Sequence, residues 1–222
     1  IGISAMAGFL TLIAGAVTSC QTSHPASNTA PFDKPIASEV RSQKPDLSAI
    51  NPTMMVGRES FPADAVGDWK PPYMYEEYYG GGSDEGCDPI TDFWERGKDS
   101  HALASLDATP NPHELRYRVD LILPKNRNHR DIASVVDACQ TFEFNDHTVR
   151  VERQSVADVP AWAAAFKLEL MPSGETQSWV MGQFRGIDVK VSATNAAGMP
   201  DPMPAVAKLF NDQVAKLEDQ PS

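Results

Sequence analysis

Acidic side chains crowd one short stretch of this chain, and carboxylates at that density could do chemistry in two ways. Oxygen ligands of this kind suit a hard cation such as Ca²⁺, although their spacing does not match an EF-hand loop. Two carboxylates could also serve glycoside hydrolysis, which depends on a separation in space that a sequence does not give. We interpret the stretch as a solvated acidic loop and predict no catalytic residue, metal ion or cofactor. Its carboxylates are Glu76, Glu77, Asp84, Glu85, Asp88, Asp92 and Glu95.

Aromatic side chains gather in the same region, which holds four of the chain's five tyrosines. Tyrosine and tryptophan offer large contact areas with little loss of side-chain entropy, so they could line a ligand groove or a protein-contact patch. The alternative is that they pack a loop-rich lobe onto the rest of the domain. The candidate binding residues are Trp69, Tyr73, Tyr75, Tyr78, Tyr79 and Trp94.

Other catalytic signals are missing from the sequence. The five histidines form no HxxxH or HExxH pair, and neither a GxSxG motif nor a GxGxxG motif occurs. The run Gly80–Gly82 has no following Lys-Ser or Lys-Thr, so it does not form a P-loop. A formal net charge of −11 disfavours nucleic acid, because lysine and arginine drive phosphate binding. We therefore predict a protein that is not an enzyme and binds no nucleic acid.

The N-terminal residues 1–19 carry no charge and end in small residues just before Cys20. An apolar core followed by a small-residue cleavage site is typical of a secretory signal peptide, here without its basic n-region. The tetrapeptide Val17–Cys20 is similar to the bacterial lipobox, in which the cysteine is acylated. A retained membrane anchor, an ordinary signal peptide or a buried helix are the alternatives. Two or more acyl chains on Cys20 would form a stable membrane anchor for an acidic body.

The cysteines support the same interpretation. Setting Cys20 aside leaves Cys87 and Cys139, and in an exported protein such a pair is expected to form a disulfide. The alternative is two free buried thiols. The disulfide would stabilise the fold by about 4 kcal/mol in the loop-entropy model.

The residues after Cys20 divide into two parts. Residues 20–50 are rich in Ser, Thr, Pro and Ala without apolar periodicity, so we predict a flexible tether. Residues 51–222 form one domain, whose first part, up to residue 112, contains many prolines and is expected to hold loops, a short strand or two and a short helix near residues 90–96. Alternating or helical periodicity follows. It predicts strands at 115–123, 141–144, 148–153, 166–170, 179–184 and 187–193, and helices at 128–139 and 205–217.

Consecutive strands joined by tight turns predict a twisted antiparallel sheet, of about 5–6 strands, with flanking helices, one of them C-terminal. The expected fold class is therefore α+β.

Several segments of the chain resemble the extracellular sensor-type domain of mycobacterial Ser/Thr kinases of the PknH kind and of related actinobacterial lipoproteins. The similar segments are the helix ending in Ala138-Cys139 with QTFEF after it, FKLEL, WVMGQFRGIDVKVSA, the closing AVAKLFNDQVAKL and the lead-in ESFPADAVGDW. The resemblance covers residues 58–218 and implies an antiparallel sheet with flanking helices and a cleft for an envelope ligand. The kinase domains carry two disulfides, whereas this chain can form one.

Together these features predict a lipoprotein on the outer side of the cell membrane, anchored through Cys20, that acts as a non-catalytic binding module. Its partner would be an envelope protein or a small ligand. The alternatives are an accessory subunit of an integral membrane complex and, in a different class, an envelope hydrolase that uses the carboxylates of the acidic loop.

Overall fold

The structure is a computed structural model, and it describes residues 42–63, 65, 67–75, 87, 101–107, 115–123, 132–144, 147–195 and 199–221. These residues belong to one compact unit that spans residues 37–222. The strands are β1 (Asp68–Met74), β2 (His101–Asp107), β3 (Arg116–Ile122), β4 (Thr141–Phe144), β5 (His147–Gln154), β6 (Ala163–Met171), β7 (Glu175–Phe184) and β8 (Ile187–Asn195). The helices are α2 (Ile132–Ala138), α3 (Met203–Glu218) and the short 3-10 helices η1 (Pro52–Met54) and η2 (Arg58–Ser60).

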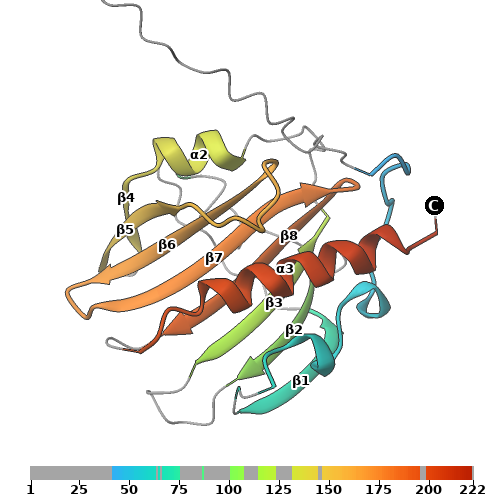
Figure 1. The fold of residues 1–222 in the computed structure, drawn as a ribbon, viewed down its shortest axis with the longest axis horizontal. Coiled ribbons are helices and arrows are strands. Elements are labelled where there is room, and N and C mark those ends of the chain that lie inside the picture. Colours follow the sequence, from blue (N-terminus) through green and yellow to red (C-terminus); the bar gives the residue numbers. More distant parts are fainter. Residues whose placement is uncertain are drawn as a thin grey trace, which may run out of the picture. The chain divides into compact units, whose positions relative to one another are not determined.

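All eight described strands form one antiparallel sheet in the order β1-β2-β3-β8-β7-β6-β5-β4 (Figure 1). Short connections join β4 to β5, β6 to β7 and β7 to β8, and each of these pairs is also adjacent in the sheet. The turn between β7 and β8 is a two-residue turn in which Arg185 and Gly186 both have positive φ, 48° and 74°. A type I′ hairpin requires positive φ at both central positions, which glycine adopts without strain.

Each face of the sheet packs an apolar layer, because side chains alternate between faces along every strand. Helix α3 lies across one face, where it packs on β7 and β8 (Figure 1). Val119, Val191 and Ala165 point to this face and share an apolar cluster with Phe210 of α3. The second face carries Phe166 and Trp179, which cluster with Val136 of the short helix α2.

The predicted α+β class with 5–6 strands was wrong, because the described residues form mostly one eight-stranded antiparallel sheet. The extra strands are β1 and β2, which lie in the proline-rich part of the domain. Pro71 and Pro72 interrupt the alternation in β1, and as an edge strand β1 tolerates residues that lack a backbone N–H.

The end of the predicted tether lies on the domain. In the described residues 42–50, the side chains of Leu47 and Ile50 are buried in the cluster that contains α3. The predicted signal peptide, Cys20 and the predicted helix at 90–96 lie outside the described residues. None of the helices that the structure describes is both long and apolar enough to cross a bilayer.

Candidate functional site

A β-bulge in β1 decides which face of the sheet receives Tyr73 in the strand and Tyr75 directly after it. Lys70 pairs with Ser105 and Tyr73 pairs with Leu103, so three steps along β1 match two along β2. The extra residue reverses the alternation, because side chains in a strand switch faces at every step. Tyr73 and Tyr75 therefore point to the second face of the sheet, opposite α3, whereas Met74 packs on the α3 side.

The same face carries a buried ionic cluster on the central strands β3 and β8. Asp120 is fully buried, and its carboxylate accepts hydrogen bonds from Arg118 Nε at 2.9 Å and Arg118 Nη2 at 2.8 Å. Lys190, directly opposite Asp120 in the sheet, places its Nζ 3.4 Å from Asp120 Oδ2. Burial of charge is tolerated here because the opposite charges are paired and hydrogen-bonded.

Aromatic rings extend this cluster on both sides. Lys190 Nζ lies 4.4 Å from the ring centroid of Trp179 on β7. On the other side, the guanidinium carbon of Arg118 lies 5.6 Å from the ring centroid of Tyr75, and the ring centroids of Tyr73 and Tyr75 are 6.3 Å apart. Cations over aromatic faces are attracted by the ring quadrupole. These side chains therefore form a continuous row across one face of the sheet, which we call the polar–aromatic row. Its members are Tyr73, Tyr75, Arg118, Asp120, Lys190 and Trp179.

The exposure of the polar–aromatic row differs along its length. Asp120 and Lys190 are sealed from solvent, whereas 25% of the Arg118 side chain and 38% of Tyr73 are exposed. Burial lowers the pKa of Arg118, but the attraction and hydrogen bonds of Asp120, helped by Tyr75 and Tyr73, raise it above its ordinary value. The Arg118 guanidinium is therefore permanently charged, so it can hold an anionic or aromatic group but cannot transfer a proton.

The structure brings together only some of the residues predicted for binding. Trp69 points to the opposite face, where its ring meets the ring of Phe61 edge-on at 4.9 Å and packs on the α3-side cluster. Tyr78, Tyr79, Trp94, the Gly80–Gly82 run and the acidic stretch at 76–95 lie outside the described residues. Within the described part of the chain, no group of three or more His, Cys, Asp or Glu side chains could hold a metal ion.

The ionic members of the polar–aromatic row were not predicted. In the sequence, Arg118 and Asp120 alternate with apolar residues, a pattern typical of a strand with one solvent-facing side. The available signal was the pair of opposite charges, Asp120 in β3 and Lys190 in β8, each with an apolar residue on either side in its strand. It becomes informative only when the two strands are known to be neighbours in register.

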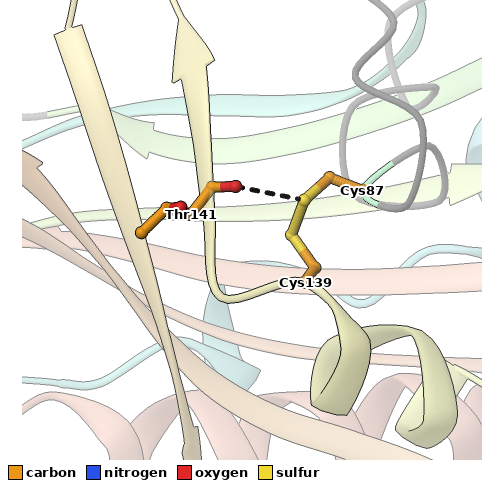
Figure 2. Close-up of a disulfide and its surroundings, with 3 residues drawn as sticks. All are labelled: Cys87, Cys139 and Thr141. Atoms are coloured by element: carbon orange, nitrogen blue, oxygen red, sulfur yellow. Dashed lines mark hydrogen bonds between the residues drawn. A yellow bond between two sulfur atoms is a disulfide. The ribbon is translucent and has the colours of Figure 1, made fainter.

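The structure contains the predicted disulfide between Cys87 and Cys139, with its sulfur atoms 1.99 Å apart (Figure 2). Cys139 follows the C-terminal end of α2, and Sγ of Cys87 lies 3.7 Å from the carbonyl oxygen of Thr141 at the start of β4 (Figure 2). Both cysteines are buried in the apolar cluster of the second face, so the disulfide is part of the core there.

No family model and no curated protein sequence matches this chain. Among solved structures, the extracellular domain of PknH from Mycobacterium tuberculosis is similar, with a TM-score of 0.48 and 12% sequence identity. The match covers 76% of this chain and 98% of that domain. The resemblance predicted from the sequence is therefore present in the structure only as a weak likeness of fold.

Proposed function

We propose that this chain is a non-catalytic binding module that works outside the cytoplasm. The observation that carries this proposal is the position of Tyr75 next to Arg118. The guanidinium of Arg118 is held in place by its hydrogen bonds to the buried carboxylate of Asp120. A permanently charged group held beside partly exposed aromatic rings suits noncovalent recognition, because arginine and tyrosine dominate the energetics of many binding surfaces. The ligand would be a small molecule or an envelope protein that presents an anionic or aromatic group.

The location outside the cytoplasm is supported by the Cys87–Cys139 disulfide. Both sulfur atoms are buried in the domain core, and structural disulfides persist mainly in oxidising compartments.

The proposed anchor is a lipid on Cys20, which is supported by the small residues before this cysteine and by the polar segment after it. A lipid would hold the acidic protein at the outer face of the membrane without any lipid affinity of the domain itself.

Binding through the exposed end of the polar–aromatic row can be tested by purifying the full-length protein in mild detergent and identifying bound ligands by mass spectrometry. We expect a ligand that co-purifies with the wild type to be reduced at least about tenfold by Tyr75→Ser, which corresponds to about 1.4 kcal/mol. The matched control is Met171→Ser, because Met171 on β6 is an exposed apolar residue, 46% accessible, on a strand distant from β1 in the sheet. Equal recovery from both variants would contradict the proposed site.

The anchor is tested separately, by Cys20→Ala and by globomycin, an inhibitor of the lipoprotein signal peptidase. Both treatments should release or mislocalise the protein. Ser19→Ala is the control, since it keeps a small residue before Cys20. Unchanged membrane retention in the Cys20 variant would refute the anchor and leave the binding proposal standing.

A further inference from the structure

Residues 42–61, which we call the strap, run from the C-terminal end of α3 to the beginning of the sheet at β1 (Figure 1). The side chains that the strap buries belong to the same apolar cluster as α3. These buried residues are Leu47, Ile50, Met55, Val56 and Phe61. The strap therefore contributes to the core, although it lies outside the sheet.

The middle of the strap is held by one fully buried side chain of α3. The backbone N–H of Val56 donates to Gln213 Oε1 at 3.0 Å, and Gln213 Nε2 donates to the carbonyl oxygen of Met54 at 2.9 Å. The Gln213 amide thus replaces the backbone partners that a neighbouring strand would supply.

The beginning of the strap is held by Arg185 in the turn between β7 and β8. The N–H of Leu47 donates to the carbonyl oxygen of Arg185 at 2.9 Å, and Arg185 Nε donates to the carbonyl oxygen of Pro45 at 3.0 Å. Arg185 Nη1 donates to the carbonyl oxygens of Leu217 and Gln220, at 2.9 and 2.8 Å. Arg185 therefore joins the strap to the last turn of α3, whose carbonyl groups favour a cation.

Not every buried polar atom where the strap meets the end of α3 has a hydrogen-bond partner. Arg185 Nη2 and Glu218 Oε2 are both buried without a hydrogen-bond partner in the structure. A buried polar group without a partner costs free energy that opening to water recovers. In contrast, β6, β7 and β8 are joined along their whole length by backbone ladders.

We propose that the strap is a releasable segment, which opens from α3 as one unit while the sheet stays folded. Segments held by few backbone hydrogen bonds commonly open below the free energy of global unfolding. Release breaks together the contacts that Arg185 and Gln213 make with the strap, and it uncovers the side of α3 that carries Gln213. The strap directly follows the segment after Cys20, so a pull on that segment first reaches the bond of Lys44 Nζ to the carbonyl oxygen of Glu218 and then the contacts of Arg185. The inference itself does not depend on a lipid at Cys20.

Amide hydrogen exchange of the full-length protein, followed by mass spectrometry, tests this proposal. In the wild type, the slow amides of the strap, such as those of Leu47 and Val56, should exchange at least about tenfold faster than those of β7 and β8. Arg185→Asn removes the guanidinium but keeps a residue type that tolerates positive φ. It should accelerate exchange in the strap and the last turn of α3 by a further factor of about ten, and leave β5 to β8 unchanged.

Arg150→Asn is the matched control, because Arg150 on β5 loses the same charge at an exposed site where it pairs with Glu169. The proposal is overturned if strap and sheet exchange at one common rate, or if Arg185→Asn accelerates all elements equally. Should Arg185→Asn not fold, Leu47→Ala carries the same expectation, since it removes a buried contact of the strap alone.

Discussion

The ammonium group of Lys190 lies over the ring of Trp179, with Nζ 4.4 Å from the ring centroid, and the lysine side chain is 1% exposed. Few places in a protein accept a lysine this deep, because desolvating its charge is costly. Here the cost is offset by the ring face and by the carboxylate of Asp120 at 3.4 Å. The stability of the sheet centre therefore depends on charges as well as on apolar packing.

Asp120→Asn should destabilise the domain by about 3 to 5 kcal/mol, because it leaves the buried Lys190 and the largely buried Arg118 without their shared carboxylate. Urea denaturation followed by circular dichroism measures the change. Asp212→Asn is the control: Asp212 pairs with Lys208 one turn away on the surface of α3, where loss of the pair should cost less than about 0.5 kcal/mol. A similar small effect at both positions would contradict the role assigned to Asp120.

Removal of the disulfide should lower stability by about 4 kcal/mol, since its cysteines are 52 residues apart and the cross-link restricts the unfolded chain. Thermal unfolding of the Cys87→Ala/Cys139→Ala variant, compared with the wild type with and without reductant, measures this loss. The intact mass of the exported protein provides the chemical check. Two free thiols there would show that the bond does not form in the cell.

Gly182→Ala should destabilise the domain by about 1 to 3 kcal/mol through overpacking. A Cβ at this position of β7 would lie 2.7 Å from Cζ3 of Trp162, whose ring stacks on Phe184 and contacts Phe210. Gly57→Ala is a matched control, because the atoms a Cβ would meet there are the carboxylate end of the flexible Glu59 side chain. Equal midpoints of urea unfolding for the two variants would argue against the predicted clash.

Asp201 should give the fold a small dependence on acidic pH. Burial raises its pKa, but the hydrogen bond from Lys167, the N–H of Met203 and attraction to Lys167 outweigh this and lower the pKa below its ordinary value of 3.8. The ionised carboxylate therefore stabilises the folded state above pH 3.8, and this contribution disappears as the pH falls through the lower pKa of the folded protein.

Asp201→Asn isolates that contribution, since asparagine still accepts the hydrogen bond from Met203. At neutral pH the variant should be less stable by up to about 1 kcal/mol, because the pair with Lys167 is partly exposed. Urea unfolding at about pH 2.5 should show a smaller difference between variant and wild type. A difference that is constant across pH would contradict the assignment.

The strands that could be predicted from the sequence are those in which apolar and polar residues alternate, or which are joined by a recognisable turn. Strand β3 and the hairpin of β7 and β8 lie close to their predicted positions, and α3 begins two residues before its predicted start, at Met203. Strands β1 and β2 lie in the stretch that the sequence predicts to hold loops and a short strand or two. Pro71 and Pro72 hide β1, because the pair and the bulge beside it break the alternation on which the prediction depends.

Of the polar–aromatic row, the sequence predicts only Tyr73 and Tyr75 as candidate binding residues. Tyr73 and Tyr75 stand out by composition, but their position over Arg118 depends on the bulge, which has no periodic signature. The burial of Asp120 and Lys190 depends on the pairing of β3 with β8, strands separated by about 70 residues of chain. Such a cross-strand pair cannot be recognised before the sheet order is known.

Because of the bulge at Pro71-Pro72, the number of residues in β1 decides which side chains lie on each face of the sheet, whatever the identity of those side chains. Deleting one of these prolines would keep the tyrosines but turn them towards α3, and would bring Met74 to the side of Arg118. Comparison of related chains should therefore score insertions and deletions in β1 as changes in the face that presents the tyrosines, even where every aromatic residue is retained.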